Sequence, residues 1–322
     1  MRILRHPSVL DPADRGAVVA VGNFDGVHLG HQAVVAYTGE EARRGGAKLA
    51  VLTFEPHPYQ VFHPQVPPFR LTPFRAKAHR IAALGVDLLV VLHFDLELAK
   101  VSAEDFVRKI LVEGVAARHV VVGYDFHFGN RRRGTPALLQ ELGAQSGFAV
   151  SVLQPVSAAA GEIYSSTTIR QHLTAGAPRQ AAALLGRPFE IEGRVETGDR
   201  RGRTIGFPTA NVSLGDYLRP AGGVYAVRVA IEAADGALDW HDGVANLGTR
   251  PTVGGSDLRL EAHLFDFAGD LYGRHLRVAL IEHLRPELKF SGLDALKTQI
   301  AEDATRARAV LAEIADGPGK SR

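Results

Sequence analysis

Two histidines three residues apart are the first chemically informative feature of the sequence. They lie in VGNFDGVHLGHQAVV (21–35), where a short apolar run ends in a glycine-rich turn and a helix is expected to begin. His28 and His31 would share one face of the first helical turn, and unpaired N–H groups at a helix start attract anions. Two imidazoles there can bind phosphate oxygens and offset the charge of a leaving pyrophosphate. The stretch is therefore typical of a protein that handles nucleotide phosphates.

A lone His-x-x-His pair also fits a turn with two satisfied histidines, or a zinc site, although no third ligand stands nearby. Two further polar segments favour the phosphate site. TFEPHP (53–58) places His57 at the end of the second predicted strand, and VVGYDFHFGNRRRG (121–134) places Asp125 and Asn130 at the end of the fourth. Ligands of open α/β sheets bind beyond the carboxyl ends of the strands. We therefore expect the three segments to form one site.

A second set of candidate residues lies in VETGDRRGRTIGFPTANVSL (195–214). Its glycines and arginines suit a loop that covers phosphates, and the residues that we expect there are Gly198, Gly202 and Arg203. Thr209 and Asn211 are two apart, so on an extended segment they project to one face. A hydroxyl and an amide oxygen on that face can hold a magnesium ion that bridges phosphates. As a pattern alone, Thr-x-Asn is weak, and a simple turn explains it better.

A carboxylate in LRLEAHLF (258–265) is a candidate general base. Apolar and polar residues alternate along this stretch, as they do in a half-buried strand, so Glu261 faces away from the apolar side. A solvated strand residue would show the same pattern. A base that takes the proton of a substrate hydroxyl during attack on a γ-phosphate also needs this access.

The first half of the chain alternates short apolar runs with helical stretches, which predicts a parallel, doubly wound, Rossmann-like α/β sheet. The strand candidates are AVVAVG (17–22), AKLAVLTF (47–54), DLLVVLHF (87–94), RHVVVGY (118–124) and FAVSVL (148–153). The helix candidates are residues 31–44, 72–84, 102–114 and 135–147, with Ser or Thr available as N-caps and Gly near their ends. Two more helical stretches follow at residues 165–176 and 178–189.

The second half reads as strands without intervening helices, which favours a small antiparallel β-barrel. The strand candidates are residues 189–196, 223–232, 238–247, 258–267 and 275–284, and a terminal helix is expected over 292–314. We place the boundary near Gly186, which predicts an α/β domain over 1–186 and a barrel domain over 187–322.

The composition is that of a globular protein with two domains. The 322 residues are 46% apolar and 22% charged, and no apolar run is long enough to span a membrane, so we expect a cytoplasmic protein. Cysteine is absent, which excludes disulfides, thiolate nucleophiles, iron–sulfur clusters and cysteine-type zinc sites. The net charge of +2 permits an anionic ligand without requiring nucleic acid.

The motifs of both halves resemble those of a known family, the bacterial bifunctional riboflavin kinase/FAD synthetases. GNFDGVHLGH, TFEPHP, VVGYDFHFG and SSTTIR, in this order, are similar to its N-terminal FMN adenylyltransferase module. GFPTAN, GVANLGTRPTVGG and LEAHLFDFAGDLYG are similar to its C-terminal riboflavin kinase module. His-x-Gly-His alone is shared by a wide superfamily of nucleotidyltransferases, so the ordered set of motifs carries the resemblance.

The resemblance implies that His28 and His31 bind ATP phosphates and stabilise the transition state of adenylyl transfer. The other nucleotide-binding residues that we expect in this module are Gly22, Asn23, Phe24, Asp25, Ser166, Thr167 and Arg170. We also expect His57, Asp125 and Asn130 to line the flavin and nucleotide pocket. A capped helix with one surface arginine would explain SSTTIR as well.

In the kinase module, the resemblance implies that Thr209 and Asn211 bind Mg²⁺ and the ATP phosphates and that Glu261 is the catalytic base. Riboflavin and ATP would then give FMN, and FMN and a second ATP would give FAD and pyrophosphate. Two alternatives remain: an enzyme with one inactive module, and a flavin- or RNA-binding protein that uses its arginine loops. Aromatic residues make up only 7% of the chain, which disfavours RNA binding. We expect a monomer or weak homo-oligomer with no nucleic-acid partner.

Overall fold

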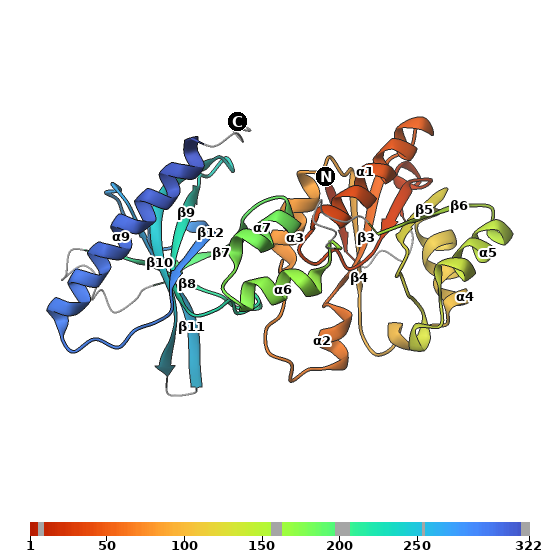
Figure 1. Cartoon of the computed structure of the whole chain (residues 1–322). Coiled ribbons are helices and arrows are strands. Elements are labelled where there is room, and N and C mark those ends of the chain that lie inside the picture. Colours follow the sequence, from red (N-terminus) through yellow and green to blue (C-terminus); the bar gives the residue numbers. More distant parts are fainter. Residues whose placement is uncertain (6–9, 156–162, 197–206, 253–254, 317–322) are drawn as a thin grey trace. The chain divides into compact units, whose positions relative to one another are not determined.

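The computed structural model describes residues 1–5, 10–155, 163–196, 207–252 and 255–316 (Figure 1). The chain divides into two compact units, Met1–Pro67 with Thr72–Ser165, and Pro68–Leu71 with Ser166–Arg322. The predicted limits 1–186 and 187–322 remain a prediction. Within the described parts of the chain, no helix combines the length and the apolar character needed to cross a membrane.

The first unit is built on a six-stranded sheet in the order β1-β4-β3-β2-β5-β6, with every pairing parallel. Its strands are β1 (Arg2–Arg5), β2 (Val18–Val21), β3 (Leu49–Glu55), β4 (Leu88–His93), β5 (His119–Gly123) and β6 (Ala149–Leu153). The five predicted strands and the doubly wound α/β class are confirmed. β1 was not predicted.

Helices cover both faces of this sheet, because alternate strand residues feed two separate apolar clusters. Val19 and Leu52 belong to one cluster and Val18 and Val51 to the other. The helices are α1 (Leu29–Arg44), α2 (Pro58–Phe62), α3 (Phe74–Ala82), α4 (Ala103–Asp105) and α5 (Pro136–Ser146). A π-helical segment, η3 (Phe106–Gly114), continues α4 and completes the helix predicted over 102–114. Three short 3₁₀ turns are η1 (Pro12–Asp14), η2 (Leu98–Lys100) and η4 (Asn130–Arg132).

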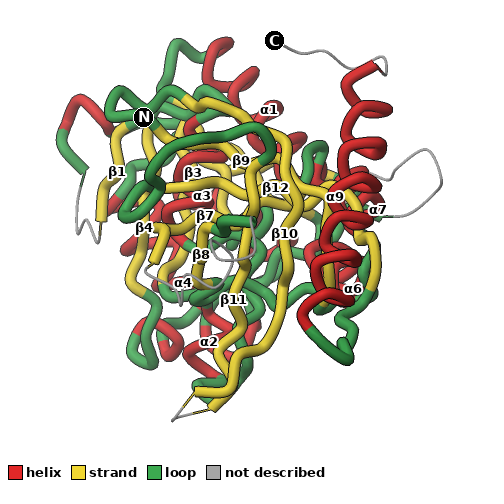
Figure 2. Tube along the Cα trace, turned by 90° about the vertical axis from the view of Figure 1, so that its left-hand side faces the viewer, coloured by secondary structure: helices red, strands yellow, loops and turns green. Residues whose placement is uncertain are grey.

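The second unit contains a closed barrel in the strand order β10-β11-β8-β7-β12-β9, which confirms the predicted antiparallel barrel (Figure 2). Its strands are β7 (Phe189–Glu196), β8 (Ala210–Ser213), β9 (Gly223–Glu232), β10 (Leu238–Thr252), β11 (Gly255–Leu264) and β12 (His275–Arg285). The unpredicted sixth strand, β8, pairs with both β7 and β11 and so closes the barrel.

Three helices accompany the barrel in the described part of the second unit: α6 (Ser166–Thr174), α7 (Pro178–Leu185) and the terminal α9 (Leu293–Asp316). Ala307 and Leu311 of α9 are buried in an apolar cluster with residues of β9, β10 and β12. Asp303 accepts a two-pronged hydrogen bond from Arg285, from Nε to Oδ1 at 2.9 Å and from Nη2 to Oδ2 at 2.7 Å. Apolar packing and this ion pair together fix α9 on the barrel.

Candidate active sites

The histidine pair lies where β2 ends and α1 begins. His28 is the N-cap of α1, and its Nδ1 accepts a hydrogen bond of 3.3 Å from the backbone N–H of His31. The two rings stack with their centroids 3.6 Å apart and their planes inclined by 21°. The ring of Phe24 packs edge-on to His31 at 5.2 Å. The pair therefore lies on one face of the first helical turn, as its spacing predicts.

The loop that carries the pair has an unusual backbone. Phe24 and Val27 have positive φ angles of 50° and 45°, a region that side chains other than glycine rarely adopt. Thr72 holds the loop, because its hydroxyl accepts from the N–H of Gly26 at 2.8 Å and its own N–H donates to Asp25 Oδ1 at 2.9 Å. Asp25 is 2% exposed. The strained conformation is thus maintained by a buried carboxylate and a hydroxyl.

His31 is neutral at neutral pH. Burial holds its pKa well below the ordinary value of 6.5, and the positive charges of His28 and Lys77 lower that pKa further. Its Nδ1 is enclosed, and no hydrogen-bond partner for it is found among the described residues. A neutral ring at a helix start can donate or accept a hydrogen bond toward a phosphate.

The loops after β3 and β5 lie beside the loop after β2, because these strands are direct neighbours in the sheet. His57 caps α2 and accepts a hydrogen bond of 3.1 Å from the N–H of Tyr59. Asp125 is exposed. The amide of Asn130 donates to the carbonyl of Ala99 at 3.0 Å, which ties its loop to η2. The three predicted segments therefore meet at one edge of the sheet.

Lys77 of α3 belongs to this edge, and our sequence analysis missed it. Its side chain is fully buried, and its Nζ lies 2.8 Å from Glu55 Oε1 and 3.5 Å from Thr53 Oγ1. A signal was available, because Lys77 falls on the helix face of Phe74, Ala78 and Ile81, at the spacing of an apolar stripe. A charged residue in such a stripe needs a buried partner.

A row of aromatic rings in the first unit, from Phe62 to Phe128, was also not predicted from the sequence. The centroid distances are 5.7 Å from Phe62 to Phe94, 6.0 Å from Phe94 to Phe54 and 6.3 Å from Phe54 to Phe106. Phe106 lies 5.5 Å from Phe128. Phe62, the first ring of this row, is 54% exposed. An exposed ring backed by buried ones is suited to stacking against a planar ligand.

Ser166, Thr167 and Arg170 lie on α6, in the second unit. Arg170 Nε donates to the carbonyl of Phe69 at 2.9 Å, and its guanidinium lies 5.4 Å from the centre of the Phe69 ring. Ser166 is half-buried and Thr167 is exposed. Their predicted contact with the nucleotide remains a prediction.

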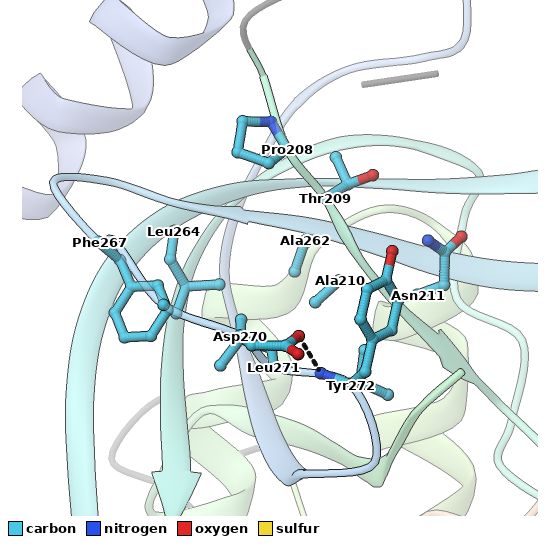
Figure 3. Close-up of a pocket in the computed structure, with 12 residues that line it drawn as sticks. Pro208, Thr209, Ala210, Asn211, Ala262, Leu264, Phe267, Asp270, Leu271 and Tyr272 are labelled. Carbon is cyan, nitrogen blue, oxygen red and sulfur yellow. Dashed lines mark hydrogen bonds between the residues drawn. The ribbon is translucent and has the colours of Figure 1, made fainter. Parts of the chain in front are cut away.

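A pocket in the second unit opens between β8, the end of β11 and the segment that follows β11 (Figure 3). Thr209 and Asn211 lie on one of its walls, and Phe267 and Tyr272 supply aromatic rings to it. The N–H of Tyr272 donates to Asp270 Oδ1 at 3.0 Å, which fixes the turn between them. The remaining lining residues are Val195, Pro208, Ala210, Ala262, Leu264, Gly269 and Leu271.

Glu261 lies beside this pocket through the register of the barrel. On β11 it is directly opposite Asn211 of β8 and Asn246 of β10. Residues directly opposite each other in neighbouring strands share a face, with Cβ atoms about 5 Å apart. Leu260 and Ala262 are buried whereas Glu261 is half-buried, which confirms the predicted alternation. Glu261 and Asn211 are thus neighbours across the β8–β11 pairing, although Glu261 is not among the residues that line the pocket.

The oxygens of Thr209 and Asn211 fit a hard cation that phosphates also coordinate. Among the described residues, no group of three His, Cys, Asp or Glu side chains could hold a metal ion. Thr209 and Asn211 are the residues of this pocket that would hold a magnesium ion together with ATP. The predicted phosphate-covering residues Gly198, Gly202 and Arg203 lie outside the described residues.

The comparisons with known proteins match both units. Residues 10–168 match the family model of FAD synthetase and residues 185–311 that of riboflavin kinase. A bifunctional riboflavin kinase/FMN adenylyltransferase of Escherichia coli K12 is 43% identical over 309 residues, which cover 96% of this chain and 97% of that protein. The protein of the same name from Pseudomonas fluorescens is 45% identical over 316 residues, with 98% and 99% covered.

A solved structure also resembles the chain over nearly its full length. The crystal structure of a Streptococcus pneumoniae protein described as a macrolide-efflux protein has a TM-score of 0.84 and 30% identity, and covers 95% of this chain and 98% of its own. The two family models match in the same order as the motifs of the two units, and the curated relatives align over nearly the whole chain. The chain therefore belongs to the family of bifunctional riboflavin kinase/FMN adenylyltransferases.

Proposed function

We propose that the second unit phosphorylates riboflavin with ATP to give FMN, and that the first unit transfers AMP from a second ATP to FMN, giving FAD and pyrophosphate. The observation that carries the proposal is that each unit has its own set of reactive groups. The first has the stacked pair His28 and His31 at a helix start, and the second has Glu261 in register with Asn211.

In the adenylyl transfer, a phosphate oxygen of FMN attacks the α-phosphorus of ATP while the bond from that phosphorus to the bridging oxygen of pyrophosphate breaks. Negative charge builds up on the leaving group. We assign His28 and His31, together with the free N–H groups at the start of α1, to that charge. Gly22, Asn23, Phe24 and Asp25 form the loop that holds these groups in place, and Ser166, Thr167 and Arg170 are further nucleotide contacts in this proposal.

The flavin of FMN needs a flat apolar surface near the adenylyl-transfer site. We assign its ring system to the exposed face of Phe62, which the half-buried ring of Phe94 and, behind it, the buried ring of Phe54 support. Aromatic stacking of this kind gains both buried area and ring–ring attraction. His57, Asp125 and Asn130, in the loops at the same edge, are the polar residues that we place around the flavin and the nucleotide.

In the kinase reaction, Glu261 accepts the proton of the riboflavin 5′-hydroxyl as that oxygen attacks the γ-phosphorus of ATP and ADP leaves. Phe267 and Tyr272 offer aromatic faces to the base of ATP. Thr209 and Asn211 would hold Mg²⁺ against the phosphates, where the ion neutralises charge on their oxygens. Gly198, Gly202 and Arg203 complete the proposed phosphate contacts.

The remaining expectations concern the protein in the cell. A cytoplasmic location, a monomeric or weakly oligomeric state and the lack of a nucleic-acid partner remain predictions from composition and charge. Gel filtration coupled to light scattering at micromolar concentration measures the mass of the protein in solution and so tests the predicted oligomeric state.

The direct test is to incubate the protein with riboflavin, ATP and Mg²⁺ and to separate the flavins by chromatography. We expect FMN to appear first and FAD to follow. FMN alone, or FAD only when FMN is supplied, would indicate one inactive module. The absence of both FMN and FAD from the riboflavin incubation, together with no FAD from supplied FMN, would contradict the proposal.

A further inference from the structure

A fully buried lysine ammonium behind the histidine pair has no part in the reaction as described so far. Lys77 is 0% exposed, and Glu55 and Thr53, which contact its Nζ, come from the carboxyl end of β3. Burying an ion pair costs several kcal/mol per ion in desolvation, and well-packed apolar residues in its place are often neutral or stabilising. Stability alone therefore does not explain a lysine at this position.

The lysine is connected to the loop that carries the histidines. Thr53, which Lys77 contacts, donates its hydroxyl hydrogen to the carbonyl of Asn23 at 3.2 Å. Thr72, just before α3, holds Asp25 and Gly26 of the same loop. The start of α3 and the end of β3 together therefore fix the loop from both sides.

The charges around His31 explain what the ammonium does there. His28 stacks on the ring from the N-cap position, the positive charge of Lys77 on α3 acts on the His31 pKa, and Glu55 at the end of β3 pairs with that ammonium at 2.8 Å. The other titratable groups of the neighbouring segments are Asp25, whose carboxylate faces Thr72, and Tyr164, which packs beside Gly30. Burial is the main cause of the lowered His31 pKa, and His28 and Lys77 add to it.

We propose that Lys77 is a positioning residue of the adenylyl-transfer site: its ammonium anchors the β2–α1 loop through Thr53 and supplies the site with a fixed positive charge. This role rests on the adenylyl transfer proposed above for the first unit. A neutral imidazole hydrogen-bonds to a phosphate without an ion pair that would have to break when pyrophosphate leaves. Lys77 supplies positive charge that does not depend on the protonation of the rings.

The test is an NMR titration of the His31 ring in the full chain, with the histidine signals assigned by a His31→Asn variant. In Lys77→Met, the loss of a buried positive charge should raise the His31 pKa above its wild-type value. In Glu55→Gln, the loss of a negative charge should leave the His31 pKa at or below its wild-type value. General loosening of the site would raise the pKa in both variants, because both rings would gain water.

Three controls make the outcome specific. Lys77→Arg keeps the positive charge, so the pKa of His31 should equal the wild-type value. Lys100→Met removes an exposed lysine of the same unit and should also leave the pKa of His31 unchanged. If Lys77→Met does not fold, Lys77→Gln takes its place, and the pKa of His31 should rise in that variant as well. FMN formation by the second unit should stay within twofold in all variants.

The proposal is overturned if the pKa of His31 in folded Lys77→Met or Lys77→Gln equals the wild-type value. It is also overturned if Glu55→Gln raises the pKa of His31 as much as the lysine variants do. The titration requires no turnover, so a wild-type protein that makes no FAD would contradict the proposed function while leaving this result interpretable. In an active enzyme, kcat for FMN adenylylation should fall about tenfold or more in Lys77→Met, with KM for ATP nearly unchanged and the acidic limb of the pH profile moved to higher pH.

Discussion

The two units hold their reactive groups in different ways. In the first, the groups lie in loops beyond the strands, and helix capping, positive φ angles and a buried ion pair fix their positions. In the second, Asn211 and Glu261 lie on the strands themselves, and the barrel register fixes their positions. A loop site depends on a few local contacts, whereas a strand site depends on the pairing of the whole barrel.

The chemistry of the two proposed nucleophiles accounts for the difference in side chains. The phosphate of FMN is already an anion, so its attack on ATP needs positive charge and hydrogen-bond donors but no base. The hydroxyl of riboflavin must lose a proton as it attacks, so that unit needs a carboxylate. Imidazoles and a lysine gather in the first unit and Glu261 stands in the second, as this argument requires.

The largest expected effect is in the first unit. Replacing His28 and His31 together with alanine should lower the rate of FMN adenylylation on the order of 10³-fold or more, because both groups that offset the leaving charge are lost. FMN formation from riboflavin should stay within twofold. Rates measured with each substrate separately check the prediction, and an equal loss of both activities in a folded variant would contradict the division of labour.

Glu261→Gln should give the reverse pattern. The amide keeps the size of the side chain but does not accept the hydroxyl proton, so FMN formation should fall about 10²- to 10⁴-fold while FMN adenylylation is unchanged. Glu302→Gln, an exposed residue of α9, is the matched control. A glutamine variant that still phosphorylates riboflavin at the wild-type rate would remove Glu261 from the mechanism.

A largely buried ion pair between Arg285 and Asp303 holds α9 on the barrel. Asp303→Asn leaves the guanidinium of Arg285 without its counter-charge, which costs about 3 to 5 kcal/mol of unfolding free energy in the second unit. Calorimetry should show the barrel transition at lower temperature while the first unit melts as before. Asp266→Asn, which breaks an exposed pair with Arg308, should leave both transitions in place; the same large shift in both variants would contradict the assignment to burial.

The smallest expected effect is the dependence of the stability of the first unit on pH. The pKa of His31 is lower in the folded state than its ordinary value of 6.5, so the unfolded state binds the proton more readily. The stability is then fully present above pH 6.5 and falls as the pH decreases toward the folded-state pKa. Thermal melts from pH 7.5 to 5 should show this slope.

His31→Asn should reduce the slope, while His63→Asn, at an exposed position of the same unit, should not. Burial also lowers the pKa of His119, so part of the slope should remain. An unchanged slope in His31→Asn would contradict the neutral, buried state of that ring.

Much of the fold follows from patterns within the sequence. Buried strands such as Leu49–Glu55 read as continuous apolar runs, and Leu258 to Leu264 alternates as a barrel strand does. β1 has mostly exposed residues at the edge of the sheet, and β8 has four residues after a proline-containing turn, so neither has a periodicity to detect. Their pairing is decided by partners distant in the chain.

The positions of the candidate site residues also followed in part from local patterns in the sequence. His28, His31 and Glu261 lie in motifs whose local spacing fixes their direction, and each is found where that spacing places it. Lys77 was missed because a lysine on a helix is ordinarily solvated, and its ion-pair partner Glu55 lies 22 residues earlier, on another element. Local patterns indicate which way a side chain points, and the fold determines what it meets.

The central claim is that two separate sites act in sequence on a released intermediate, and a mixing experiment tests it most directly. Equal amounts of the His28→Ala/His31→Ala protein and the Glu261→Gln protein are incubated together with riboflavin, ATP and Mg²⁺, and the flavins are separated over time. The account predicts that the mixture makes FAD and that neither variant does so alone, because the first supplies FMN that the second adenylylates. A mixture that makes no FAD, although each variant performs its remaining reaction, would contradict it.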